Sequence, residues 1–222
     1  MSSRPAAGGG RWVPVAPERL TRWIAGFAER HGPATELAQP YGVLLHAEDG
    51  ATAELHAPPG ATSAGDVDGF VAEANRPRRI GLLLARKGAV AVGVADGTEL
   101  VASKVDRAYV QGRTAAGGWS QQRFARRRDN QAKAALGEAA ELAVRILLPE
   151  AARLAALVTG GDRRAVDGVL ADRRLAPLGA LRADRLLDVP EPRHAVLVEA
   201  IAAARAVHIL VREPAGDPPA AD

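Results

Sequence analysis

Three apolar segments separated by two short glycine turns constrain the fold more than any other feature of this sequence. Residues 80–86 and 89–95 flank the turn Lys87-Gly88. A third segment, residues 98–105, follows the turn Asp96-Gly97. Short turns that contain glycine, placed between apolar runs of this length, are typical of hairpins. The pattern therefore predicts a meander of three antiparallel strands.

The second half of the sequence predicts helices that alternate with strands. Residues 121–148 have apolar positions at helical spacing, and Pro149 fits the end of that helix. Shorter elements should follow: strands at 155–159, 186–189 and 207–211, and helices at 162–170 and 192–204. Such alternation indicates α/β layering. The expected fold class is α/β (α+β): a mixed sheet with an antiparallel meander, flanked by helices.

The first third of the sequence predicts a smaller region of helix and hairpin. Apolar residues recur at helical spacing over residues 17–30. Residues 41–47 and 51–57 are joined by an Asp-Gly turn and predict a hairpin. A short helix is expected at residues 66–74.

Composition divides the chain into four expected segments. Residues 1–10 are rich in small residues, Pro and Gly, and are expected to be disordered. Residues 11–75 form the helix-plus-hairpin region, which we expect to pack on the main domain. Residues 76–212 form that main domain, and residues 213–222 form a flexible tail rich in Pro and Ala.

The positive charge of the chain is concentrated in one segment. The net charge is +3, yet residues 107–133 contain seven Lys and Arg residues against one acid, Asp129. That segment is therefore +6, and the rest of the chain is −3. A local basic patch on an otherwise slightly acidic protein indicates an anionic partner.

Several kinds of site and location are disfavoured by the composition. The chain has no cysteine, which excludes disulfides and thiolate metal sites and fits a reducing cytoplasm. Its five histidines show no ligand spacing, so no metal and no cofactor are expected. We expect no signal peptide and no membrane span, and hence a cytoplasmic protein. Gly160-Gly161-Asp162 follows a predicted strand and could hold a phosphate, but it lacks the rest of a P-loop.

The basic segment contains a glycine pair placed directly before a helix start. Residues 117–128 read Gly-Gly-Trp-Ser-Gln-Gln-Arg-Phe-Ala-Arg-Arg-Arg. Glycine pairs let the backbone approach a crowded ligand closely. Arginines on the next helical turns suit a phosphate backbone, although they oppose the helix macrodipole. The run therefore predicts a loop that enters an RNA-lined cavity.

This run resembles the catalytic loop and following helix of eukaryotic and archaeal class 1 peptide-release factors. That family carries Gly-Gly-Gln-Ser, two residues, then Arg-Phe-Ala-Arg-x-Arg. Eight residues fall in register: Gly117, Gly118, Ser120, Arg123, Phe124, Ala125, Arg126 and Arg128. The resemblance extends over about residues 78–211 and implies that the main domain is a release-factor-like catalytic domain.

One departure from the family pattern concerns the catalytic glutamine. Trp119 stands where the family has glutamine, and Gln121 and Gln122 follow two and three residues later. This spacing resembles the diverged Vms-type release-factor homologues, with the actinobacterial branch most similar. The Vms-type homologues hydrolyse peptidyl-tRNA on stalled large ribosomal subunits. The resemblance implies Gln121 as the catalytic residue, with Gln122 as the alternative, and Gly117 and Gly118 as the loop that carries it.

The resemblance implies that the protein hydrolyses the ester of peptidyl-tRNA and that its partner is the large ribosomal subunit. We expect the protein to be a monomer. The residues implied in RNA binding are Arg113, Trp119, Ser120, Arg123, Arg126, Arg127 and Arg128. Trp119 either stacks on a base or packs against the domain. Two alternatives stay open. One is a non-catalytic ribosome- or RNA-binding module with the same fold, and the other is a different hydrolase built around Gly160-Gly161-Asp162.

Overall fold

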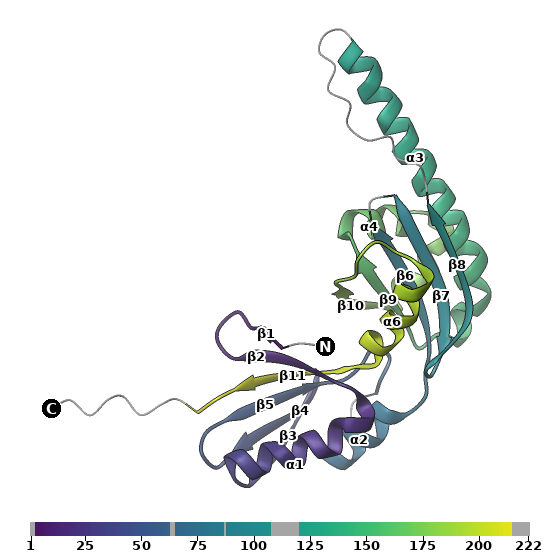
Figure 1. The fold of residues 1–222 in the computed structure, drawn as a ribbon. Helices are drawn as coiled ribbons and strands as arrows, with labels where there is room; N and C mark the ends of the chain where they lie inside the picture. The colour runs from purple at the N-terminus through teal and green to yellow at the C-terminus, as the bar shows by residue number, and fades with distance from the viewer. Residues whose placement is uncertain (1–2, 63–64, 87, 108–119, 215–222) are drawn as a thin grey trace, which may run out of the picture. The chain divides into compact units, whose positions relative to one another are not determined.

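The computed structural model describes residues 3–62, 65–86, 88–107 and 120–214, with only the backbone described for residues 120–130 and 132 (Figure 1). The chain forms two compact units. Unit 1 comprises Met1–Arg76 and Arg205–Asp222, and unit 2 comprises Pro77–Ala204. Unit 2 is thus inserted between two segments of unit 1.

Unit 1 is an antiparallel sheet with two helices on one face. The sheet order is β1 (Arg4–Pro5), β2 (Arg11–Val15), β11 (Val207–Arg212), β5 (Thr52–His56), β4 (Gly42–Ala47) and β3 (Ala34–Gln39). Its helices are α1 (Leu20–His31), which follows the 3-10 turn η1 (Pro17–Arg19), and α2 (Val67–Asn75). Fully buried Phe27 of α1 and Phe70 of α2 pack against alternate residues of the strands, such as Leu55. This alternation is expected when only one face of a sheet is covered by helices.

Unit 2 contains a five-stranded mixed sheet. Its order is β10 (Arg182–Leu187), β9 (Ala156–Gly161), β6 (Arg79–Arg86), β7 (Ala89–Asp96) and β8 (Glu99–Arg107). β6, β7 and β8 are antiparallel neighbours, whereas β9 runs parallel to both β6 and β10. The predicted meander therefore forms one side of the sheet, and the predicted strands around residues 155–159 and 186–189 form the other.

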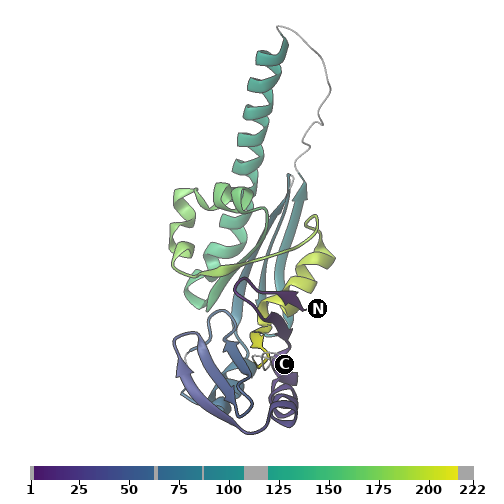
Figure 2. The ribbon, with the colours of Figure 1, turned by 90° about the vertical axis from the view of Figure 1, so that its left-hand side faces the viewer.

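Helices cover both faces of this sheet. The helical elements are α3 (Ser120–Leu147), η2 (Leu148–Arg153), α4 (Arg163–Leu170), η3 (Arg173–Leu175), α5 (Ala176–Gly179) and α6 (His194–Arg205). Figure 2 shows α3 and α4 on one side of this sheet and α6 on the other. Leu83 of β6 belongs to the apolar cluster with α3 and α4, whereas its neighbours Leu82 and Leu84 belong to the cluster with α6. Because both faces are covered, β6 and β7 are apolar at nearly every position. The fold class expected from the sequence is confirmed.

Three features of unit 1 differ from the sequence-based expectation. Residues 1–10 were expected to be disordered, yet Arg4 and Pro5 form β1, paired with Trp12 and Arg11 of β2. β2 itself is unexpected because Pro14 has no N–H to donate. That strand pairs with β1 only at Arg11 and Trp12, and Pro14 lies opposite His208 of β11. β3 is an exposed edge strand without apolar alternation, so no periodicity reveals it.

Candidate functional site

The candidate catalytic loop lies between β8 and α3 of unit 2. β8 ends at Arg107, and α3 begins at Ser120. Four of the residues that the sequence singled out, Arg113, Gly117, Gly118 and Trp119, lie outside the described residues. The structure therefore describes β8, which precedes the loop, and α3, which follows it.

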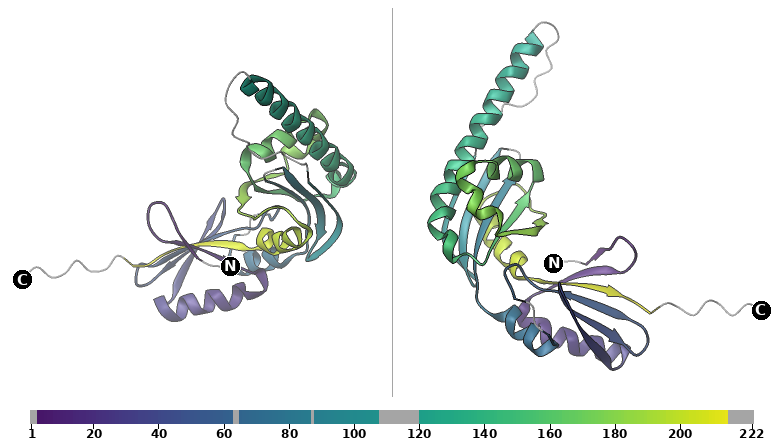
Figure 3. Two further views of the ribbon diagram at one scale, coloured as in Figure 1. Left: turned by 45° about the horizontal axis from the view of Figure 1, so that its top comes forward. Right: turned by 180° about the vertical axis from the view of Figure 1, so that it is seen from behind.

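α3 is a long helix of which only the C-terminal half packs on the sheet. It has 28 residues, which corresponds to about 42 Å at 1.5 Å per residue. Among the side chains of α3 that the structure describes, the buried ones lie between Ala139 and Leu147. The earlier turns extend beyond the sheet of unit 2 (Figures 1 and 3). The chain thus presents the N-terminal end of α3 at a distance from the core.

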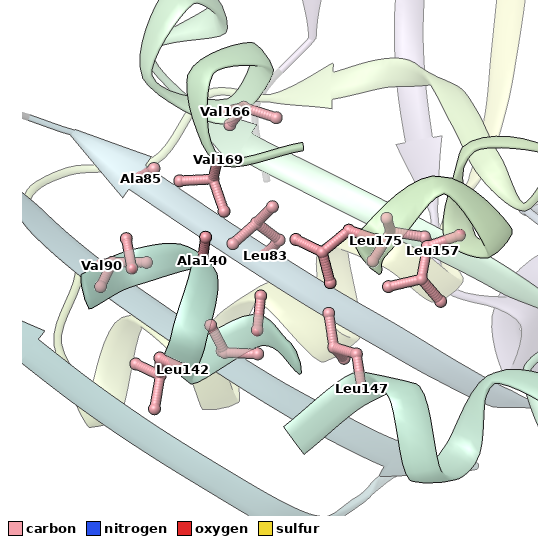
Figure 4. Packing of buried hydrophobic residues seen from close by; sticks show 14 of the residues in the cluster. Leu83, Ala85, Val90, Ala140, Leu142, Leu147, Leu157, Val166, Val169 and Leu175 are labelled. Atoms are coloured by element: carbon pink, nitrogen blue, oxygen red, sulfur yellow. The ribbon is translucent and has the colours of Figure 1, made fainter. Parts of the chain in front are cut away.

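The packed half of α3 is held by an apolar cluster with β6, β7 and α4. Leu142 and Leu147 of the helix lie against the sheet, and Val166 and Val169 come from α4 (Figure 4). Leu147 is fully buried, and its Cδ2 atom would lie 3.2 Å from a Cβ atom built on Gly81. Gly81 therefore leaves the room that Leu147 fills. This packing fixes the C-terminal half of α3, which we call the root of the helix, on the sheet.

The candidate glutamines and arginines occupy the projecting turns of α3. Gln121 and Gln122 lie in the first turn, directly after Ser120. The first four N–H groups of a helix have no partner within it, so donors are concentrated at this end. The spacing of Arg123, Arg126 and Arg127 puts their Cα atoms on one side of the helix. Arg128 follows in the same basic run, and the first turn contains no acidic residue.

The two units differ in charge, and the candidate site belongs to the basic one. Unit 2 contains 21 Lys and Arg residues against 14 Asp and Glu, a net charge of +7. Unit 1 contains 8 against 12, a net charge of −4. Residues 107–133 contribute +6 of the charge of unit 2, so a polyanion is attracted chiefly to this segment and to the start of α3 within it.

An ion-pair cluster ties α3 to the segment after α4. Nη1 of Arg174 lies 2.7 Å from Oε1 of Glu141, and Nη2 of Arg174 lies 2.7 Å from Oδ2 of Asp172. The backbone N–H of Arg174 also donates to Asp172, with an N–O distance of 2.9 Å. Hydrogen bonds from the Arg174 side chain and backbone lower the pKa of Asp172 to about 2. Arg174 therefore bridges a carboxylate on α3 and one on η3.

Stability at acid pH should depend on Asp172. A carboxyl group with a lowered pKa in the folded state stabilises the fold above the unfolded-state pKa of about 4, and this contribution is lost as the pH falls toward 2. The urea midpoint of Asp172→Asn should therefore lie below that of the wild type at neutral pH, with the gap closing as the pH falls through this window. The measurement is urea denaturation followed by circular dichroism at a series of pH values. Asp184→Asn, at an exposed aspartate with no ion pair among the described residues, serves as the control. A gap that stays constant with pH would contradict this assignment.

Gly160-Gly161-Asp162 forms the turn from β9 into α4. The Asp162 N–H donates to the carbonyl oxygen of Ala85, with an N–O distance of 2.8 Å. Oδ1 of Asp162 accepts a hydrogen bond from the Ala165 N–H at 3.1 Å and caps α4, as predicted. Gly161 has φ +96°, and a Cβ atom there would lie 2.4 Å from the Ala85 oxygen. The geometry of this turn is that of a helix cap pinned to a neighbouring strand.

Gly161→Ala should destabilise the protein by about 1–3 kcal/mol, because alanine disfavours a positive φ and its Cβ atom collides with backbone. The matched control is Gly137→Ala in the interior of α3, where an added Cβ atom meets nothing within 4 Å. That change should stabilise the helix by about 0.5–1 kcal/mol. Chemical denaturation of both variants measures the two effects, which should have opposite signs. Equal effects would contradict the reading of Gly161.

Other chemistry has little support within the described part of the chain. No group of three or more His, Asp or Glu residues there is arranged to hold a metal ion. Nor does any helix in these ranges have the length and apolar character to cross a membrane. Nδ1 of His31 lies 2.9 Å from Oδ2 of Asp49, and Nε2 of His56 lies 3.4 Å from Oε2 of Glu54, so both rings have carboxylate neighbours within unit 1.

The structure also brings together residues that the sequence analysis did not single out. A cavity of about 260 Å³ lies between α3, α4 and the β6–β7 hairpin. Exposed Asp106, Glu138 and Arg164 contribute to its lining, although they are far apart in the sequence. The one sequence signal is the pair Arg163-Arg164, which places two positive charges directly after the capping Asp162.

The match to a known protein family falls mainly in unit 2. A family model described as "Actinobacteria/chloroflexi VLRF1 release factor" matches residues 78–210, more than half of the chain. Two solved structures are similar. One, described as "Archaeal protein", is 21% identical, with a TM-score of 0.38, over 63% of this chain and 37% of that chain. The chain therefore spans little more than a third of that relative.

The second is a crystal structure of the archaeal translation termination factor aRF1, which is 15% identical, with a TM-score of 0.39, over 86% of this chain and 73% of that chain. None of the curated proteins compared matches the chain.

Proposed function

Because the chain belongs to the family of actinobacterial and chloroflexi VLRF1 release factors, we propose that it hydrolyses the ester of peptidyl-tRNA on stalled large ribosomal subunits. Membership of the family supports the coarser role of a release-factor-like protein, and the ribosome as partner is part of the proposal. The observation that carries the finer proposal is α3. Its packed half is anchored in the core of unit 2, and its projecting turns carry the glutamines and arginines.

The reaction requires a positioned water and stabilisation of a developing oxyanion. Water attacks the carbonyl carbon of the ester, and the bond to the terminal ribose oxygen breaks, so the peptide leaves as a carboxylate. The amide of Gln121 can accept a hydrogen bond from the water through its oxygen and donate to the oxyanion through its nitrogen. Gln122 is the alternative. A neutral amide is not a strong base, so the 2′-hydroxyl of the ribose serves as the proton relay to the leaving 3′-oxygen.

The remaining candidate residues position the RNA. Arg123, Arg126 and Arg127 pair with phosphates, which fixes the register of the helix on its substrate and supplies no chemistry itself. Gly117 and Gly118 allow the loop to fit between RNA bases, and Trp119 stacks on one of them. Arg113, Ser120 and Arg128 extend the same contact. Each of these roles remains a proposal for the residue named.

The direct test uses the full chain and isolated large subunits that carry peptidyl-tRNA with a labelled nascent peptide. We expect the peptide to be released and the tRNA to be recovered deacylated, at a rate that rises with protein concentration. Intact ribosomes with the same peptidyl-tRNA serve as the comparison, and release should be slower there. If the protein binds the subunits tightly but leaves the ester intact, the hydrolase proposal is wrong.

A second candidate function is a ribosome- or RNA-binding module without catalysis. The observation that favours it is the charge of unit 2, since +7 supports binding to RNA whatever the glutamines do. Binding without turnover in the assay above would establish this reading. Binding together with turnover would exclude it.

A further inference from the structure

The cavity between α3, α4 and the β6–β7 hairpin has apolar walls built largely from small side chains. The alanines that line it are Ala85, Ala89, Ala135, Ala139 and Ala165. Because these side chains end at Cβ, the three elements leave a gap bordered by larger residues such as Val90 and Val169 (Figure 4). Protein interiors rarely leave voids larger than a water molecule. An open gap of about 260 Å³ is therefore a feature of the surface that a ligand could fill.

Arg164 provides a positive charge at this cavity that the described protein does not neutralise. It is the second residue of α4, it is exposed, and within the described ranges it has no ion-pair partner. Several other arginines of unit 2 have carboxylate partners, as Arg182 has in Asp167 at 2.7 Å, whereas Arg163 and Arg173, like Arg164, have no ion pair among the described residues. A cation in the first turn of a helix opposes the macrodipole, so Arg164 gains nothing from its position in the fold. An anion would compensate it.

Hydrogen-bond acceptors complete the lining of the cavity. Glu138 of α3 is exposed and has no ion-pair partner among the described residues. Oδ1 of Asp106 accepts a hydrogen bond from the Arg107 N–H at 2.7 Å, which leaves its other oxygen available. Carboxylate oxygens accept hydrogen bonds from the amino groups of nucleobases. The lining also contains Arg86, whose Nη1 donates to the carbonyl oxygen of Val189 at 2.7 Å. The cavity thus combines apolar walls, two cations, of which Arg164 has no ion-pair partner among the described residues, and two acceptors.

We propose that this cavity receives one unstacked nucleotide of the bound RNA, a proposal that rests on the RNA substrate of the proposed function. The base enters between the apolar walls, its amino group faces Glu138 or Asp106, and Arg164 pairs with the phosphate. The size fits a single base better than a larger ligand, since sites for drug-sized molecules measure about 300–1,000 Å³. An apolar peptide side chain would use the walls alone, and it would leave Arg164 without a partner. The nucleotide comes from ribosomal RNA or from the tRNA.

Two variants test the two parts of the cavity. Ala135→Leu fills it from α3, and its control is Ala134→Leu, at an exposed neighbour on the same helix that does not line the cavity. Arg164→Ala removes the cation, and its control is Arg173→Ala, at an exposed arginine outside the cavity. Thermal unfolding by circular dichroism checks that all four variants fold as the wild type does.

The measurements are the affinity for large subunits that carry peptidyl-tRNA and the reactivity of every RNA base toward a base-modifying reagent. Ala135→Leu and Arg164→Ala should weaken binding about tenfold, the magnitude expected for one base contact. The base that the wild type protects should become reactive in Ala135→Leu and stay protected in Ala134→Leu. Its position in ribosomal RNA or in tRNA identifies the source. Arg164→Ala should also lower the salt dependence of binding, which Arg173→Ala should not.

Two results would overturn the proposal. One is an unchanged protection pattern in Ala135→Leu. The other is weaker binding with no base affected, which would assign the cavity to a protein side chain. Loss of hydrolysis is a separate matter. If the wild type released no peptide but protected a base in a cavity-dependent manner, the hydrolase proposal would fail and this one would stand. Normal release with an unaltered protection pattern in Ala135→Leu would sink this one alone.

Discussion

Gln121→Ala is expected to reduce the rate of peptide release from large subunits by about 10²–10³-fold, the loss seen when one oxyanion donor is removed from a hydrolase. The reason is that the amide is proposed both to position the water and to stabilise the charge that develops on the carbonyl oxygen. Affinity for the subunits should change little, because the arginines of α3 remain. The measurement is single-turnover release of labelled peptide at saturating protein.

Two further glutamines make this prediction specific. Gln122→Ala should keep most of the activity if Gln121 is the catalytic residue. Gln131→Ala changes the same residue type in the same helix, about three turns closer to the packed half, and should release peptide at the wild-type rate. Loss of activity in Gln122→Ala alone would move the assignment by one residue. Full activity in both Gln121→Ala and Gln122→Ala would rule out catalysis by a glutamine of this motif.

The second large effect is expected at the root of α3. Leu147→Ala should destabilise the protein by about 2–5 kcal/mol, because it removes a fully buried side chain that packs over Gly81 between Leu154 and Leu157. The loss has two parts, the transfer free energy of the deleted methyl groups and the cavity left behind. Urea denaturation measures it, and the unfolding of unit 2 can be followed by amide hydrogen exchange of β6, β7 and β9.

Val101→Ala is the matched control for this change. Val101 lies on β8 of the same unit with 48% of its surface exposed, so its truncation should cost less than about 1 kcal/mol. Release of peptide by Leu147→Ala should also fall at temperatures where the variant is still folded, since the projecting turns depend on a fixed root. A folded variant with unchanged release would show that the anchoring of α3 does not limit the reaction.

The elements of unit 2 could be predicted from the sequence because its patterns are local. Gly88 and Gly97 separate apolar runs, and those runs became β6, β7 and β8. The basic run at residues 117–128 also predicted the family, and the family match over residues 78–210 confirms that prediction. The sequence could not show that Asp106, Glu138 and Arg164 share a cavity, because packing brings them together and no spacing encodes it.

Unit 1 was harder to predict for the same physical reason. A strand was expected at residues 207–211 from their apolar run, and the structure has it at Val207–Arg212. An apolar run does not show which strands will pair with it. In the structure β11 pairs with β2 on one side and with β5 on the other. β2 was not predicted because it contains Pro14, a residue that is uncommon within strands. β3 was not predicted because an exposed edge strand needs no apolar alternation. Whether these segments form strands depends on pairing with residues far away in the sequence, and the local sequence contains little information about that pairing.

The place of β11 in the middle of the first sheet has a consequence for biosynthesis. A ribosome making this chain completes residues 77–204 before it reaches residues 207–212. Unit 2 can therefore fold while β2 and β5 still lack the strand that joins them. The first part of the protein to be translated is the last to reach its final hydrogen-bonded state, and a chain interrupted before residue 207 would expose two unpaired strand edges to aggregation.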